Sequence, residues 1–259
     1  MEEKEIEKTQ EQLDNEYQYD NGFHPKEVVL KPNYVFYPRN IFYAILRRFT
    51  VLLSKFIFFF PKFFVWGYRL KGRKYKKYLK GSVIVCNHAF TFDAFCILTA
   101  LWTKTIDVTT LQSNLGFGLA SKYFRAGGVV PIPTDETLMI KFMKETKNIL
   151  KTRHNVLVYP EAMLMPYCDH IRQFKQGAFY IALNGSSNKI MIAVHTFHKP
   201  KGLYKLVRRK KPCIHLNLLP PYEIKDIKNR RERLDVTQRE IHQIMSDFFI
   251  KNSDYFYEK

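Results

Sequence analysis

The sequence predicts an α/β protein with a mainly parallel mixed sheet flanked by helices, preceded by an N-terminal hydrophobic helical segment that contacts a membrane. Two observations carry this prediction. From residue 81 onward, short apolar runs alternate with stretches of helical periodicity, which is typical of parallel βα units. Before that point, residues 41–66 form the most hydrophobic stretch of the chain. With 259 residues, 46% of them hydrophobic, the chain can bury a full core, and a wholly disordered protein is excluded.

The predicted strands are short and apolar, and they cover residues 82–86, 128–132, 156–159, 190–194 and 213–219. The predicted helices lie between these strands, at 91–102, from a cap at Thr134 or Asp135 to about residue 150, and at 175–183. In a sheet of this type, functional side chains collect where strands end and helices begin.

Charge divides the chain into unequal parts. The formal net charge is +18, but residues 1–16 hold seven acids against two lysines, which leaves 40 basic and 17 acidic residues elsewhere, or about +23. We predict an acidic mobile tail over 1–24, a hydrophobic and basic membrane-association segment over 25–80, and a catalytic domain over 81–259. The positive charge favours an anionic partner: nucleic acid, an anionic membrane or a phosphorylated substrate.

The hydrophobic stretch 41–66 is interrupted by Lys55 and Lys62, and Pro61 breaks its helical pattern. It therefore lacks the run of about 18 uncharged residues that a spanning helix needs. A buried core helix is one interpretation. We favour an interfacial helix, in which Arg47, Arg48 and the two lysines extend to lipid headgroups while the phenylalanines enter the acyl region.

A basic run follows at 69–80, with seven basic residues and no acid. It is either a solvated loop or, beside an apolar anchor, a segment that lies against anionic lipid. A nucleic-acid-binding arm is a third interpretation, but no recognition fold accompanies it. We expect an anionic membrane surface as a partner, and no nucleic acid.

The cysteines are Cys86, Cys96, Cys168 and Cys213, and none lies in a CxxC pair. We expect reduced thiols, and therefore a membrane-associated protein on the cytoplasmic face. The spacings Cys86-x-His88 and His195-x-x-His198 each offer two metal ligands at most, so no metal site is predicted.

His88 and Asp93 are the candidates for catalysis. His88 lies two residues beyond a predicted strand, and its imidazole can act as a general base near neutral pH. On one regular helix the five-residue separation corresponds to roughly 500°, which would place the two side chains on different faces. The pair therefore requires His88 on a turn that folds back, so that Asp93 orients one ring nitrogen and the other accepts a proton. A histidine with a purely structural hydrogen bond is the alternative.

Three segments together resemble the glycerolipid acyltransferase family, which includes the bacterial lysophosphatidic acid acyltransferases. Asn87, His88 and Asp93 match the family motif NHxxxxD in full. Tyr159-Pro160-Glu161-Ala162 matches the motif FPEG in part, and residues 174–179 match the element FKxGAF that contains Gly177. Order and spacing agree over roughly residues 81–200, so the predicted catalytic domain resembles an acyltransferase domain.

The resemblance implies transfer of a fatty acyl group to a hydroxyl of a glycerol-phosphate or lysophospholipid acceptor in phospholipid synthesis. His88 would deprotonate the hydroxyl, and Asp93 would orient the imidazole. No cofactor is implied, since the donor is a co-substrate: acyl-CoA, the acyl form of an acyl carrier protein, or an acyl phosphate. Glu161 would bind the acceptor, although capping of a helix is an equal alternative. Arg172 and Lys175 could hold a phosphate, or form a solvated basic surface.

The chain departs from the family pattern at three places. The second motif normally ends in arginine, where this chain has Thr134, which takes that place among the acceptor-binding candidates. A lysine found upstream in the family is absent around residues 112–114, and Lys122 or Arg125 could supply the missing charge. Ala162 replaces the usual glycine. These changes leave acyl transfer plausible and the acceptor undetermined.

Two other functions remain open. A catalytically inactive, membrane-bound lipid-binding protein of the same fold would explain the motifs and the apolar segment. A basic nucleic-acid-binding protein would explain the charge alone, and it ranks last. His195 and His198 fall near a fourth family motif, but the match is too loose to assign them a role.

Overall fold

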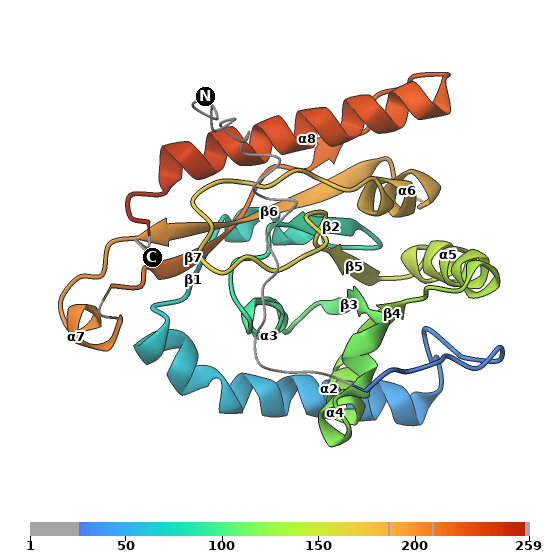
Figure 1. Cartoon of the computed structure of the whole chain (residues 1–259), viewed down its shortest axis with the longest axis horizontal. Coiled ribbons are helices and arrows are strands. Elements are labelled where there is room, and N and C mark those ends of the chain that lie inside the picture. The colour runs from blue at the N-terminus through green and yellow to red at the C-terminus, as the bar shows by residue number, and fades with distance from the viewer. Residues whose placement is uncertain (1–25, 186, 209, 257–259) are drawn as a thin grey trace, which may run out of the picture.

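The computed structural model describes residues 26–185, 187–208 and 210–256 (Figure 1). The predicted tail over 1–24 lies outside these residues. Within the described part of the chain, one eight-stranded sheet lies between two layers of helices. The predicted α/β class and mainly parallel mixed sheet are confirmed.

The sheet order is β1-β7-β6-β2-β5-β3-β4, and β8 pairs with β6. Strand β6 is antiparallel to β7 and β8, and all other neighbouring strands are parallel. The carboxyl end of central strand β2 therefore lies at the middle of one sheet edge. The strands are β1 (Arg69–Lys71), β2 (Val83–Cys86), β3 (Thr105–Leu111), β4 (Val129–Ile132), β5 (His154–Val158), β6 (Lys189–His198), β7 (Cys213–Leu218) and β8 (Tyr222–Glu223).

The helices cover both faces of the sheet (Figure 1). One layer contains α2 (Ile41–Ile57), α3 (Asp93–Ala100) and α4 (Leu119–Gly127). The other contains α5 (Glu136–Leu150), α6 (Gly177–Asn184) and α8 (Arg230–Asn252). Right-handed crossovers explain this division, because the chain moves outward from β2 to β4 and then returns through β5 to β6. Shorter helical elements are the π-helix η1 (Pro61–Val65), the 3-10 helices η2 (Arg73–Tyr78) and η3 (Gln112–Gly116), and α7 (Tyr204–Arg208).

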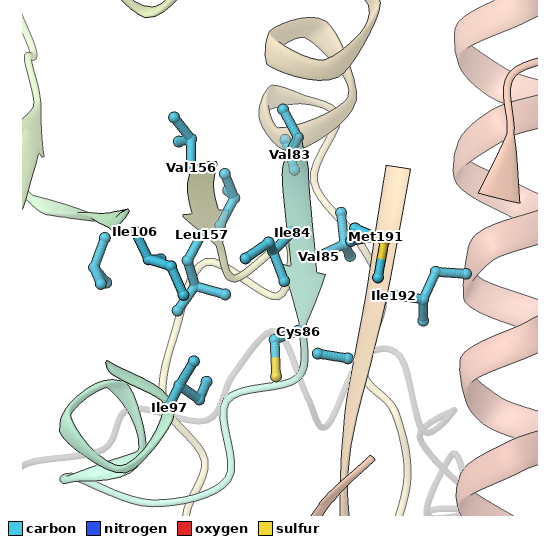
Figure 2. Packing of buried hydrophobic residues seen from close by; sticks show 14 of the residues in the cluster. Val83, Ile84, Val85, Cys86, Ile97, Ile106, Val156, Leu157, Met191 and Ile192 are labelled. Atoms are coloured by element: carbon cyan, nitrogen blue, oxygen red, sulfur yellow. The ribbon is translucent and has the colours of Figure 1, made fainter. Parts of the chain in front are cut away.

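The core is centred on β2, all four of whose side chains are buried. A parallel strand that is covered by helices on both faces buries successive residues rather than every second one. Figure 2 shows β2 between Leu157 of β5 and Met191 of β6, with Ile97 of α3 below them. This packing fixes the position of the turn that follows Cys86.

An ion pair anchors α2 to the sheet. Arg47 donates a 2.6 Å hydrogen bond to Asp107 in the middle of β3 and a second to the carbonyl of Ile106. Asp107 also accepts from His154 at 2.9 Å. A Cβ atom on Gly128 would lie 2.5 Å from the Arg47 guanidinium, and the positive φ of +99° also favours glycine there. Arg47 is therefore a buried structural group.

This placement corrects part of the interfacial interpretation. Arg47 and Lys62 do not extend outward, because both lie on the inner sides of their elements; Lys62 is 7% exposed and donates to Thr99 at 3.3 Å. The outer side is strongly apolar. No helix in the described part of the chain is long and apolar enough to cross a bilayer. The exposed apolar residues of α2 and η1 include Ile41, Phe42, Ile45, Phe49, Phe56 and Phe63.

The basic run 69–80 forms strand β1 and helix η2 rather than a loop. Because β1 is parallel to β7 and β7 is antiparallel to β6, β1 runs antiparallel to β2. It begins near the edge where β2 ends and carries η2 to the opposite edge. Residues of the 25–80 segment thus share one sheet with residues of the 81–259 segment. The sequence did not predict β1, β3, β8, α4, α7 and α8.

Candidate active site

The turn between β2 and α3 brings His88 and Asp93 together. Asp93 is the first residue of α3, and its Oδ2 lies 2.7 Å from Nδ1 of His88. The same oxygen accepts the backbone N–H of Ala89 at 2.8 Å and that of Phe90 at 3.4 Å. The chain therefore folds back at the turn, which is the geometry that the five-residue spacing requires.

The charge state of Asp93 determines the tautomer of His88. Burial alone would raise the pKa of Asp93, but the neighbouring His88, His195 and the Ala89 amide outweigh burial and lower that pKa. An ionised carboxylate only accepts hydrogen bonds, so Nδ1 of His88 carries the proton. Nε2 is left as a proton acceptor on a side chain that is 23% exposed. This is the arrangement of a general base with its orienting acid.

Tyr159 completes the pair, and the sequence did not single it out for this role. Its ring stacks on the imidazole of His88, with centroids 4.3 Å apart and planes at 17°. Its hydroxyl donates a 2.9 Å hydrogen bond to Oδ1 of Asp93. Burial, together with the charge of Asp93, raises the pKa of Tyr159 well above its usual value, so the hydroxyl stays a donor. The sequence carried one signal for this role: the family motif usually has phenylalanine at this position, and this chain adds a hydroxyl.

Asn87 directly follows β2, and its hydrogen bonds tie the turn to the neighbouring strand β6. Its side chain accepts from the backbone N–H of His195 at 2.7 Å and donates to the carbonyl of His195 at 3.2 Å. Nδ1 of His195 lies 3.1 Å from the Asn87 carbonyl, and Nε2 lies 3.0 Å from the Tyr68 hydroxyl. A carbonyl only accepts, so His195 is protonated at Nδ1, and its Nε2 accepts a hydrogen bond from the Tyr68 hydroxyl. His195 is thus a buried positioning group for the turn.

Glu161 lies buried behind the turn, with 4% of its surface exposed. Burial raises its pKa to about 8, against the opposing effects of Arg172 and of a backbone hydrogen bond from His88. Helix capping is not its role, because the N-cap of α6 is Gln176. The buried Arg172 donates to the carbonyl of Met163 at 3.2 Å. Glu161 and Arg172 are therefore both buried, close to each other and to the backbone of His88.

The other motif residues have mainly backbone roles. The buried Pro160 accepts the backbone N–H of Lys175 at 2.7 Å, while the Lys175 side chain is exposed. Gly177 is the first residue of α6, and a Cβ atom there would meet no neighbour, so crowding does not explain this glycine. Ala162 has a φ of +59°, which accounts for the usual glycine in this motif.

Thr134 lies far from His88, along the edge of the sheet where β2 ends. It follows β4, which is separated from β2 by β5 and β3, so three strand spacings of roughly 4.8 Å place it about 14 Å away. Its side chain is exposed, and its backbone N–H donates to Gln112 at 3.1 Å. Arg125, a candidate replacement for the missing charge, instead donates to the backbone carbonyls of Val35 and Val129.

One side-chain group within the described residues has metal-ligating atoms close together. The ligand atoms of Cys168, Asp169 and His170 all lie within 4.8 Å of one another. Three consecutive residues on an irregular segment offer a mixed sulfur, oxygen and nitrogen set. His170 already contacts Asp169 at 2.7 Å. The chemistry available to His88 and Asp93 uses none of these atoms.

Comparison with known proteins places this site in a family. A family model described as Acyltransferase matches residues 68–196, which contain the His88–Asp93 turn and the Tyr159–Ala162 segment. A search of curated proteins gave no match. The fold is similar to the crystal structure of 1-acyl-sn-glycerophosphate (LPA) acyltransferase from Thermotoga maritima, with a TM-score of 0.53, 14% identity, and 81% of each chain covered. The chain therefore belongs to the glycerolipid acyltransferase family.

Proposed function

We propose that the protein transfers a fatty acyl group from a thioester or acyl-phosphate donor to a hydroxyl of a glycerol-phosphate or lysophospholipid acceptor, in phospholipid synthesis. The observation that carries the proposal is the 2.7 Å contact between Nδ1 of His88 and Asp93, which leaves Nε2 as the proton acceptor. Membership of an acyltransferase family supports the class of reaction.

The proposed reaction needs no acyl-enzyme. Nε2 of His88 removes the acceptor hydroxyl proton as the oxygen attacks the donor carbonyl, and the resulting imidazolium is stabilised by Asp93. The tetrahedral intermediate then collapses, the bond to the thiolate or phosphate breaks, and the leaving group takes the proton. Base catalysis of this type contributes typically about 10²–10⁴-fold.

For the acceptor, we propose that Glu161 and Arg172 act close to the base, with Lys175 at the surface. The raised pKa of Glu161 and its position beside the His88 backbone support a role near the reacting hydroxyl. Arginine suits bidentate contact with a phosphate. Thr134 has no charge and lies about three strand spacings away, so we expect it to contribute little to phosphate binding.

We also propose that the enzyme works at the cytoplasmic face of a membrane, with α2 and η1 in the interface. The exposed aromatic and aliphatic side chains of these elements support this, since apolar surface of this kind on a soluble protein marks an interaction site. Phe92, in the catalytic turn, is 43% exposed and stacks on Trp66 just after η1, at 5.6 Å. The apolar surface therefore extends to the turn where a lipid acceptor would react.

The test is product identification. Purified protein is incubated with labelled acyl-CoA, acyl carrier protein thioester or acyl phosphate, each with a panel of glycerol phosphate and lysophospholipids, and lipid products are identified by mass spectrometry. We expect one donor and acceptor pair to give an ester product. Binding of the same lipids without any transfer across the panel would support the inactive lipid-binding alternative.

A further inference from the structure

A cavity of about 350 Å³ lies at the edge of the sheet opposite His88. It opens where β3 and β5 begin, at Thr105 and His154, and α2 forms its other wall. Because β2, β5 and β3 are parallel, the starts of these strands lie a full strand length from the catalytic turn. A ligand in this cavity would not touch His88 or Asp93.

The cavity has an apolar part and a basic part. Val51, Leu98, Ile106 and Ile149 line the apolar part. The basic part holds Arg39, Arg48 and Lys104, and no carboxylate among the described residues pairs with any of these three side chains. Within the described part of the chain, Arg48 donates only to the carbonyl of Trp102, at 2.9 Å. On the inner wall, the positive charge of Arg47 is already balanced by Asp107, which His154 also contacts.

More positive charge surrounds the mouth of the cavity. Burial, and then repulsion from Lys80 and Arg153, lower the pKa of Lys104. Burial, and then repulsion from Lys104 and Arg73, lower the pKa of Lys76. The later part of the basic run 69–80, from Arg73 onward, therefore lies near the cavity, while its first residues lie near the edge where β2 ends. A bound anion would relieve this repulsion.

The cavity also adjoins the apolar face of α2. Arg48 follows the exposed Ile45 by three residues and precedes the exposed Leu52 by four, so it lies beside both on the helix surface. A bilayer that receives Ile45 and Leu52 would hold its headgroups at the level of Arg48. We propose that this cavity binds the anionic headgroup of a membrane phospholipid, with its phosphate at Arg48 and Lys104 and its glycerol and first acyl carbons against Val51 and Ile106. The site is separate from the proposed acyl transfer.

The test measures binding to the full-length chain by isothermal titration calorimetry. The probe is dihexanoyl phosphatidylglycerol below its micellar concentration, compared with dihexanoyl phosphatidylcholine, inorganic phosphate and a single-stranded oligonucleotide. The variant Arg48→Ala/Lys104→Ala removes the basic part, and Ala44→Phe narrows the cavity from α2. The matched control, Lys228→Ala/Arg231→Ala, removes the same charge at the start of α8, on the other face of the sheet.

We expect phosphatidylglycerol to bind, with at least tenfold weaker affinity in the Arg48→Ala/Lys104→Ala and Ala44→Phe variants and unchanged affinity in the control. Equal affinity in the wild type and both cavity variants would overturn the proposal. So would equal binding of phosphatidylcholine, or binding of inorganic phosphate as tight as that of the lipid. If the Arg48→Ala/Lys104→Ala variant lost affinity for the oligonucleotide but not for the lipid, the site would be assigned to nucleic acid. Acyl transfer, assayed separately, distinguishes failure of this site from failure of the proposed reaction.

Discussion

The ring of Tyr159 lies 4.3 Å from the imidazole of His88, nearly parallel to it, and its hydroxyl reaches past that ring to the carboxylate of Asp93. His88 and Asp93 are thus both contacted by one side chain, at the end of β5. That strand is parallel to β2 and directly beside it, so the contact depends on the sheet register and not on the turn alone.

Tyr159→Phe keeps the stacking and removes the hydroxyl. We expect a loss of about 2 kcal/mol in the free energy of unfolding, typical of a hydrogen bond to a charged group. Asp93 would also lose the donor at Oδ1 that holds its carboxylate beside His88, so kcat should fall as well. Unfolding in urea and steady-state kinetics measure the two effects. Tyr222→Phe is the matched control, since it removes a hydroxyl that contacts Glu240 far from the turn; an equal fall in kcat there would contradict the assignment.

Asp93→Asn should remove most activity with the turn still formed. The amide oxygen would keep the position that accepts the Ala89 N–H and Nδ1 of His88, but a neutral amide no longer stabilises the imidazolium that forms as His88 takes the proton. By analogy with serine hydrolase triads, we expect a loss of about 10³–10⁴-fold in kcat. Circular dichroism and lipid binding check that the variant is folded. Retention of more than a tenth of the wild-type rate would show that the charge of Asp93 does not assist His88.

Ala162→Gly should stabilise the protein. Ala162 has a φ of +59°, where a Cβ atom costs about 1 kcal/mol or slightly more, and glycine does not carry this cost. The exposed helical Ala120 in α4 is the control, because glycine there should destabilise by about 1 kcal/mol. Urea denaturation of both variants measures the sign of the change in the free energy of unfolding. A loss of stability in Ala162→Gly would mean that the left-handed backbone at residue 162 is not strained.

Glu161 should make stability depend on pH. Its pKa is raised by burial to about 8 in the folded chain, above the unfolded value, so its contribution is fully present below about pH 4.5 and is lost as pH rises through 8. The wild type should lose a few kcal/mol relative to Glu161→Gln between pH 5 and pH 9. Denaturation at both pH values measures this difference, and parallel curves for the two proteins would show that the carboxyl is not protonated at neutral pH.

Much of the fold could be predicted from the sequence, because those elements are determined by patterns within short stretches of the chain. β2, β5 and β6 are continuous apolar runs, and the caps and apolar face of α5 are visible in the chain. β3 was missed because its sequence contains Thr105, Asp107 and Thr109, and the partner that permits burial of Asp107 is Arg47, which lies 60 residues away. α8 was missed because its buried residues are sparse along 23 residues.

The site shows the same division between local and long-range information. The turn that joins His88 and Asp93 could be derived from their spacing and the adjacent strand. The roles of Tyr159, Tyr68 and His195 could not, because they depend on which strands lie next to β2 in the sheet. The expected outward positions of Arg47 and Lys62 were wrong, since composition does not tell which side of a helix faces the sheet.

The acyl-transfer rate of the His88→Ala variant tests most directly the central claim, that His88 is the general base. The acyl donor and acceptor that give product with the wild type are supplied to the purified variant, and ester formation is followed with a labelled acyl group while circular dichroism confirms folding. We predict a loss of at least 10²-fold in kcat with little change in unfolding midpoint, because the imidazole is partly exposed and its removal leaves the Asp93–Tyr159 contact in place. Wild-type turnover in a folded His88→Ala protein would contradict general-base catalysis by His88.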